Sequence, residues 1–232
     1  MVDNSMVCTP HNIPQSVYVL LLLENSSGLF DIWPDLRDRY LGPLLQKIEV
    51  DNSSSPVITF VLESLPANST QIKRPIVPRQ YHTSHDGLLS VRFNDSPSNR
   101  LTYSKIQEAA QFITSKIDAN GSVLRHIVIA AASPPLEETS AEPESGFPPG
   151  TSCWYRLADY LAKADVRCHL MLKSGQDWEG LTNLFEEMLQ LQQITEDKTM
   201  AIDMHKIIVR LSSQRKSSQR DNKTHGPGNS GA

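Results

Sequence analysis

The sequence predicts a three-layer α/β fold with a mostly parallel central sheet and helices on both faces. Four mainly apolar runs have the length of buried strands, and helical patterns lie between them. The runs are residues 17–23, 57–62, 124–132 and 166–172. Such runs are typical of strands that are buried on both sides, as in a parallel sheet covered by helices. We therefore expect these four segments to form the centre of one Rossmann-like sheet.

The segments between the first three strands show one clear helix and one irregular stretch. Residues 33–50 have apolar positions at helical spacing, and residues typical of a helix N-terminus lie at their beginning. Residues 65–79 contain three prolines, which exclude a helix but allow an edge strand over residues 72–77. Residues 88–93 form a short strand or a helical turn, and a second helix is expected over residues 103–117.

The second half of the chain repeats the strand–helix pattern. The third strand ends at Ser133, which two prolines follow, and an acidic loop rich in proline and glycine runs from residue 136 to 150. Ser152 is the expected N-cap of a helix that ends near residue 164. A further amphipathic helix is expected over residues 177–191, after the fourth strand.

These elements define one folded domain with flanking segments. We expect a flexible N-terminal segment (1–16), the α/β domain (17–191), a C-terminal extension (192–211) and a disordered basic tail (212–232). We interpret the tail mainly as a solvated terminus. The alternative is that its basic residues serve in nuclear import or contact phosphate groups.

Composition excludes several classes of protein. The first apolar run is too short to cross a bilayer, and the polar residues before it do not resemble a signal peptide, so we expect no membrane contact. A net charge of −4 disfavours nucleic-acid binding by the folded domain. Three cysteines without a C-x-x-C pair indicate neither a disulfide framework nor a zinc site, and fit a reducing compartment.

The candidate functional site is the loop that follows the first strand. Glu24 ends the apolar run, and a hydroxyl at Ser26 and a small residue at Gly28 follow at steps of two. Open α/β sheets bind ligands at the carboxyl ends of their strands, where this loop is expected. Neither of the common glycine-rich phosphate-binding motifs is present.

The order of these segments resembles the von Willebrand factor type A domain in the family of Mediator complex subunit 25. The strongest similarity lies in residues 35–44 within the segment 20–49, and it continues in residues 126–135 and 157–189. The resemblance covers roughly residues 17–191. It implies a non-catalytic, nuclear docking module that binds other Mediator subunits and couples transcription regulators to RNA polymerase II. Transcription activators are the further candidate partners, although direct activator capture, which larger family members perform with a separate domain, is not carried over to this sequence, which is either a reduced form or a fragment.

The resemblance also implies a degenerate metal site. Typical type A domains bind a divalent cation through Asp-x-Ser-x-Ser, a middle-loop threonine and a later aspartate, whereas Glu24, Ser26 and Gly28 occupy the first motif here. Ser133 stands near the end of the strand where the later aspartate is expected. Candidates for the middle-loop ligand, among which the sequence does not choose, are Ser96, Ser98 and Thr102. Because Mg²⁺ needs about six converging oxygen ligands, we expect no metal and no cofactor. Glu24 is expected to accept hydrogen bonds from loop N–H groups instead.

Three aromatic residues are candidate anchors for a protein partner. Phe30 and Trp33 follow the strand-end loop, and Phe147 lies in the acidic loop. Aromatic anchors supply much of the energy of protein interfaces, but each of the three could equally be a lid on the core. Trp178 is expected to be such a lid.

Two other functions remain as alternatives. One is a metal-dependent type A domain that binds ligands outside Mediator. The other, less favoured, is a hydrolase that uses the serines of the strand-end loop, for which no G-x-S-x-G elbow is present. His126 and His169 lie inside predicted strands, where we expect them in the core or on a sheet face rather than as ligands or bases.

Overall fold

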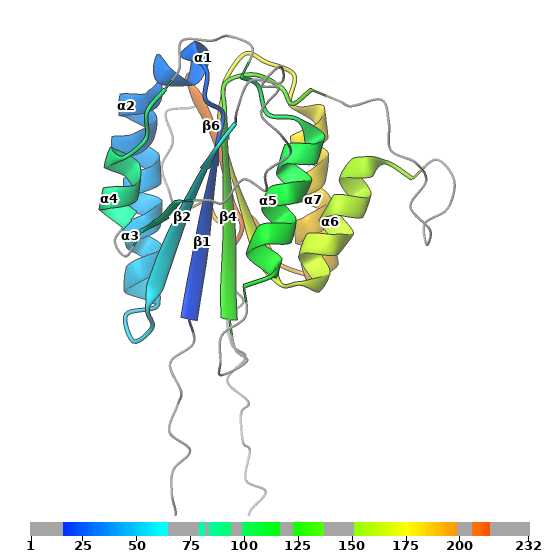
Figure 1. Cartoon of the computed structure of the whole chain (residues 1–232). Coiled ribbons are helices and arrows are strands. Elements are labelled where there is room, and N and C mark those ends of the chain that lie inside the picture. The colour runs from blue at the N-terminus through cyan, green and yellow to red at the C-terminus, as the bar shows by residue number, and fades with distance from the viewer. Residues whose placement is uncertain are drawn as a thin grey trace, which may run out of the picture.

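The strands of this chain form one mixed, mostly parallel sheet. The computed structural model describes residues 16–64, 79–81, 84–93, 99–116, 123–136, 151–198 and 206–213. Within these residues the strands are β1 (Ser16–Leu23), β2 (Val57–Glu63), β3 (Arg79–Tyr81), β4 (Val123–Ala131), β5 (Val166–Lys173) and β6 (Ile207–Leu211). Their order in the sheet is β3-β2-β1-β4-β5-β6 (Figure 1). The four predicted central strands are confirmed: β2, β1, β4 and β5 are parallel, and β3 and β6 pair antiparallel at the edges.

Helices cover both faces of the sheet, which confirms the α/β class. On one side lie α1 (Ser27–Phe30), α2 (Trp33–Leu36), the π-helical turn η1 (Arg37–Leu41), α3 (Gly42–Asp51) and α4 (Ser84–Leu89). On the other side lie α5 (Tyr103–Thr114), α6 (Cys153–Lys163) and α7 (Glu179–Gln192), as Figure 1 shows. The strand order is that of doubly wound, Rossmann-like sheets.

Alternate residues of the central strands point into two separate cores. In β1, Leu20 and Leu22 pack with the α5–α7 side, whereas Val19, Leu21 and Leu23 pack with the α1–α4 side. This alternation follows from the period of two in a strand. Because helices cover both faces of β1, residues 17–23 are apolar throughout.

The helix predicted over residues 33–50 contains a π-helical turn at a proline. Pro43 has no N–H to donate, and its ring would crowd the carbonyl one turn earlier in a regular helix. The chain widens there, so that the N–H of Gly42 donates to the carbonyl of Arg37, five residues back. The helix continues as α3 without a break, because a widened turn accommodates the proline.

Other elements differ from the expectation or refine it. Residues 88–93, expected as one short element, divide between the end of α4 and an irregular segment. β6 was not predicted from the sequence. It pairs with β5, so the extension over residues 192–211 contributes a strand to the sheet. The edge strand considered over residues 72–77 lies outside the described residues, and β3 follows it. Ser152 caps α6 as predicted, accepting from the N–H of Trp154.

The segments 1–15 and 214–232 lie outside the described residues, as does most of the acidic loop. Among the helices that are described, none combines the length and apolar character needed to cross a membrane.

Candidate functional site

The strand-end loop lies where the direction of the sheet's connections reverses. β1 pairs with β2 on one side and with β4 on the other, and the chain crosses to opposite faces of the sheet from β1 and β4. In open α/β sheets, ligands bind outside the carboxyl ends of the strands at this point. Glu24 follows β1 there, and Ala132 and Ser133 follow β4.

The carboxylate of Glu24 is fully buried and bound by three donors from the protein itself. Oε2 accepts the backbone N–H of Ala132 at 2.8 Å and that of Ser133 at 2.9 Å. Oε1 accepts the hydroxyl of Ser26 at 2.6 Å. The prediction that Glu24 accepts hydrogen bonds from loop N–H groups is confirmed. Charge-assisted bonds of this kind join the end of β1 to the end of β4.

Ser26 and Gly28 also have structural roles at this end of the sheet. Ser26 is the N-cap of α1, where its oxygen accepts the N–H of Leu29 at 3.3 Å while its hydroxyl donates to Glu24. Gly28 approaches the end of β4 closely: a Cβ at this position would lie 3.2 Å from the Cβ of Ala132. The methyl group of Ala132 therefore crowds the place where a serine at position 28 would present a hydroxyl.

A second set of hydrogen bonds joins β1 to the end of β2. The N–H of Asn25 donates to Oγ of Ser64 at 2.8 Å, and the hydroxyl of Ser64 donates to the carbonyl of Asn99. The N–H of Ser64 donates to the carbonyl of Leu23 at 2.9 Å. Sequence reasoning missed Ser64 and Asn99; the one available signal was a polar residue directly after the second apolar run.

We call this set of buried residues the strand-end polar cluster. Its members are Glu24, Asn25, Ser26, Ser64 and Asn99, all of them at most 7% exposed. The middle-loop candidate Thr102 is not part of it, because Thr102 caps α5 by accepting the N–H of Lys105. Ser96 and Ser98 lie outside the described residues. In the described part of the chain, no group of three histidine, cysteine, aspartate or glutamate residues is arranged to hold a metal ion.

The structure separates the candidate aromatic anchors by their exposure. Phe30 is 55% exposed, whereas Trp33 is only 7% exposed. The ring of Phe93 contacts both, with centroids 5.9 Å from Phe30 and 5.1 Å from Trp33. Phe147 lies outside the described residues. Trp178 is a buried lid as predicted, and its indole N–H donates to the carbonyl of Lys173 at 2.9 Å.

The strand-end polar cluster is tied to this aromatic group through Asn25. Its side-chain amide donates to the carbonyl of Arg92 at 3.2 Å, directly before Phe93 in the chain. Phe93 in turn supports Phe30 from one side while Trp33 lies buried beneath. The exposed ring of Phe30 thus rests on the ring of Phe93.

Comparisons with known proteins add no assignment to this site. No protein-family model matches the chain, and no curated protein matches it either.

Proposed function

We propose that this chain is a non-catalytic protein-docking domain of the von Willebrand type A kind, acting in the nucleus as part of a Mediator subunit. Its partners are other Mediator subunits, through which it couples transcription regulators to RNA polymerase II. The proposal rests on the resemblance of residues 35–44 and 126–135 to that family, together with the doubly wound strand order.

The observation that carries the docking proposal is the exposed ring of Phe30. Phenylalanine is usually buried, and this side chain keeps more than half of its surface in solvent while resting on Phe93. It lies beside the strand-end polar cluster, at the edge of the sheet where doubly wound domains bind their ligands. An exposed aromatic ring at this edge of the sheet fits a protein anchor.

The hydrogen bonds of Glu24 speak against the metal-dependent alternative. The N–H groups of Ala132 and Ser133 point their hydrogens at the oxygens that would bind a cation. A cation would have to displace these donors, and it would lack the hydroxyl ligand that Gly28 does not supply. A titration with Mg²⁺ or Mn²⁺ is therefore expected to show no micromolar binding, and binding abolished by Glu24→Gln would establish the alternative.

The position of Ser26 speaks against the hydrolase alternative. Its side chain is 3% exposed, and its oxygen is engaged with Glu24 and with the N–H of Leu29. A nucleophile must reach the substrate and needs a base, an orienting group and a charge stabiliser around it. Ser26 serves instead as a helix cap between two strand ends.

The docking proposal is tested by co-precipitation of Mediator with the full chain from nuclear extract. Wild type is expected to recover Mediator subunits, and Phe30→Ala is expected to reduce this recovery at least tenfold. A tenfold reduction corresponds to a loss of about 1.4 kcal/mol, and truncating an anchor usually costs about 2 kcal/mol or more. Thermal melting of the variant should match wild type, since Phe30 is mostly exposed.

Tyr155→Ala is the matched control, because Tyr155 is also an exposed aromatic residue but lies on α6, on the other side of the sheet. It should leave recovery unchanged. If wild type recovers no Mediator subunits, the Mediator assignment is wrong. If Phe30→Ala and Tyr155→Ala both bind like wild type, the docking surface lies elsewhere.

A further inference from the structure

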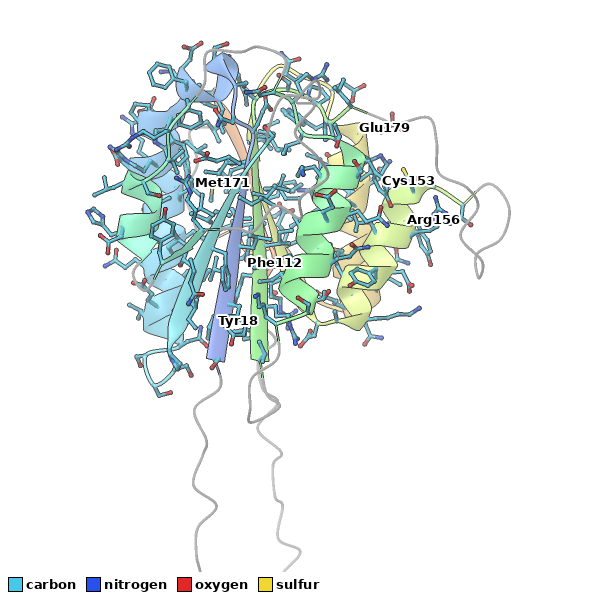
Figure 2. The ribbon with its side chains drawn as sticks, in the orientation of Figure 1. Tyr18, Phe112, Cys153, Arg156, Met171 and Glu179 are labelled. Atoms are coloured by element: carbon cyan, nitrogen blue, oxygen red, sulfur yellow. The ribbon has the colours of Figure 1, made fainter. Side chains whose placement is uncertain are left out.

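Two histidines face each other on the α3 side of the sheet. His126 in β4 and His169 in β5 are 2% and 3% exposed, and neither belongs to the strand-end polar cluster. They lie on the same face as Val128 and Met171, which pack in the core beneath α1–α4. Figure 2 labels Met171, two residues along β5 from His169, inside the layer between the sheet and α3.

The two rings are joined edge to edge by one hydrogen bond. Nδ1 of His126 lies 3.0 Å from Nε2 of His169, and the ring planes differ by only 9°. The ring centroids are 5.3 Å apart. This separation exceeds the distance between the two nitrogens by about the diameter of one ring, so the nitrogens lie between the ring centres. The contact is therefore an in-plane N–H···N bond rather than face-to-face stacking.

This bond requires at least one ring to be neutral. One ring must donate its single N–H and the other must accept with its lone pair. The outer nitrogens, Nε2 of His126 and Nδ1 of His169, are buried and make no hydrogen bond in the described structure. Either choice of tautomers thus leaves one N–H and one lone pair without a partner, at a cost in stability. A first proton on the outer nitrogen of the donor ring would keep this bond but place a charge in the core, and only a proton on the second ring as well would set two N–H groups against each other.

The surroundings add positive charge to the pair. Arg167 is the register partner of His126 and is 4% exposed; its guanidinium contacts Asp165 at 3.5 Å and Gln192 at 3.4 Å. Asp197, which follows α7, raises the pKa of His169, whereas Arg167 lowers it.

The other neighbouring elements present apolar side chains to this face. Val19 of β1 is the register partner of His126, and Leu211 of β6 is that of His169. From α3, Leu45 and Ile48 enter the same core, and the charged groups Lys47 and Asp51 pair with each other at 2.8 Å.

We propose that the His126–His169 pair is an acid-sensitive latch between β4 and β5. When both rings are neutral, the pair holds the α3-covered face of these strands together. Uptake of a first proton buries a new charge beside Arg167, and uptake of a second replaces the shared N–H···N bond with facing donors, so this face opens. The latch is independent of the proposed docking function, because it lies away from the strand-end polar cluster.

The pH range over which the latch acts follows from the pKa values of the two histidines in the folded and the unfolded chain. Burial, followed by the charge of Arg167, lowers the pKa of His169 to about 3, and burial with the neighbouring ring lowers the pKa of His126 well below its ordinary value. Unfolded histidine titrates near pH 6.5. The stabilising contribution of the neutral pair is therefore complete above about pH 6.5 and is lost as the pH falls toward 3.

The first test is an NMR titration of the imidazole resonances of the full chain between pH 7.5 and 5. We expect both rings to stay neutral, with one N–H shared between them, for as long as the chain is folded. If either ring titrates near pH 6.5 in the folded protein, the latch does not exist. This measurement needs no variant, so it decides the matter even if variants fold poorly.

The second test compares urea unfolding at several pH values between wild type and the double variant His126→Leu/His169→Leu. In wild type, each ring should raise the unfolding constant by up to about tenfold for each pH unit below 6.5. The double variant should lose this dependence, up to about a hundredfold per unit for two rings. His85→Gln, which removes an exposed histidine from α4, is the control and should keep the wild-type profile. An unchanged profile in a folded double variant would overturn the proposal.

Discussion

At the scale of single residues, Glu24 shows how donors from the protein itself stabilise a buried carboxylate at a strand end. A carboxylate that is completely buried must be matched by donors, and this one receives two backbone N–H groups and one hydroxyl. The N–H groups of Ala132 and Ser133 lie just beyond the end of β4 and would be unpaired without Glu24. Glu24 is therefore a structural link between β1 and β4.

This role predicts different losses for two substitutions of Glu24. Glu24→Ala leaves two buried N–H groups without acceptors and should lower the free energy of unfolding by about 3 kcal/mol or more. Glu24→Gln keeps one carbonyl oxygen for these groups and an amide for Ser26, so we expect a loss of about 1–2 kcal/mol. Urea unfolding at pH 7 measures both. Glu179→Gln, at an exposed position in α7, should stay within about 0.5 kcal/mol of wild type. Equal stability of Glu24→Ala and wild type would show that the carboxylate is dispensable.

At the scale of elements, α6 and α7 are fitted together through a glycine. Gly180 lies in the first turn of α7 against the indole of Trp154, and a Cβ there would come within 2.6 Å of two ring atoms. Trp154 is 5% exposed and contacts the ring of Tyr103 edge-on at 5.3 Å. The indole is therefore confined on several sides and cannot move away from an added methyl group.

Two glycine-to-alanine substitutions should consequently have opposite effects. Gly180→Ala is expected to lower stability by about 1–3 kcal/mol because it overpacks this contact. Gly87→Ala, within α4, meets no atom closer than 3.4 Å and should gain up to about 1 kcal/mol from helix propensity. Thermal melting of the two variants beside wild type measures this difference. If both variants shift in the same direction, the contact with Trp154 does not control the spacing of α6 and α7.

The elements also show which features the sequence could predict. Mainly apolar runs identified β1, β2, β4 and β5, because burial on both faces leaves that pattern in a strand. β6 was missed although Ile207 to Leu211 is mostly β-branched and apolar, since a short edge strand is defined by its partner rather than by its own pattern. The π-helical turn before Pro43 was missed for a related reason: a proline predicts disruption but not whether the helix continues beyond it.

At the scale of the whole molecule, the strand order explains why part of the candidate site was predictable. Any parallel sheet brings the residues after neighbouring strands to one edge, so Glu24 could be placed near a strand end from the sequence alone. The hydrogen bonds of Asn25 with Ser64 and Arg92 could not be predicted from the sequence, because they join positions 39 and 67 residues apart. The burial of Trp33 likewise depends on Phe93, which reaches it only in the folded chain.

The sheet as a whole predicts that a fragment ending at Gln192 is much less stable than the full chain. This truncation removes β6, whose Ile207, Val209 and Leu211 are at most 7% exposed in the α1–α4 core, and it opens the edge of β5. Burial of such side chains contributes about 1.5–3 kcal/mol each, so the loss should exceed about 4 kcal/mol, a large part of the stability of an ordinary domain. Urea unfolding of this fragment, beside one ending at Ser213 that retains β6, measures the difference. If the two fragments unfold at the same urea concentration, β6 is an accessory strand and the fold is complete without it.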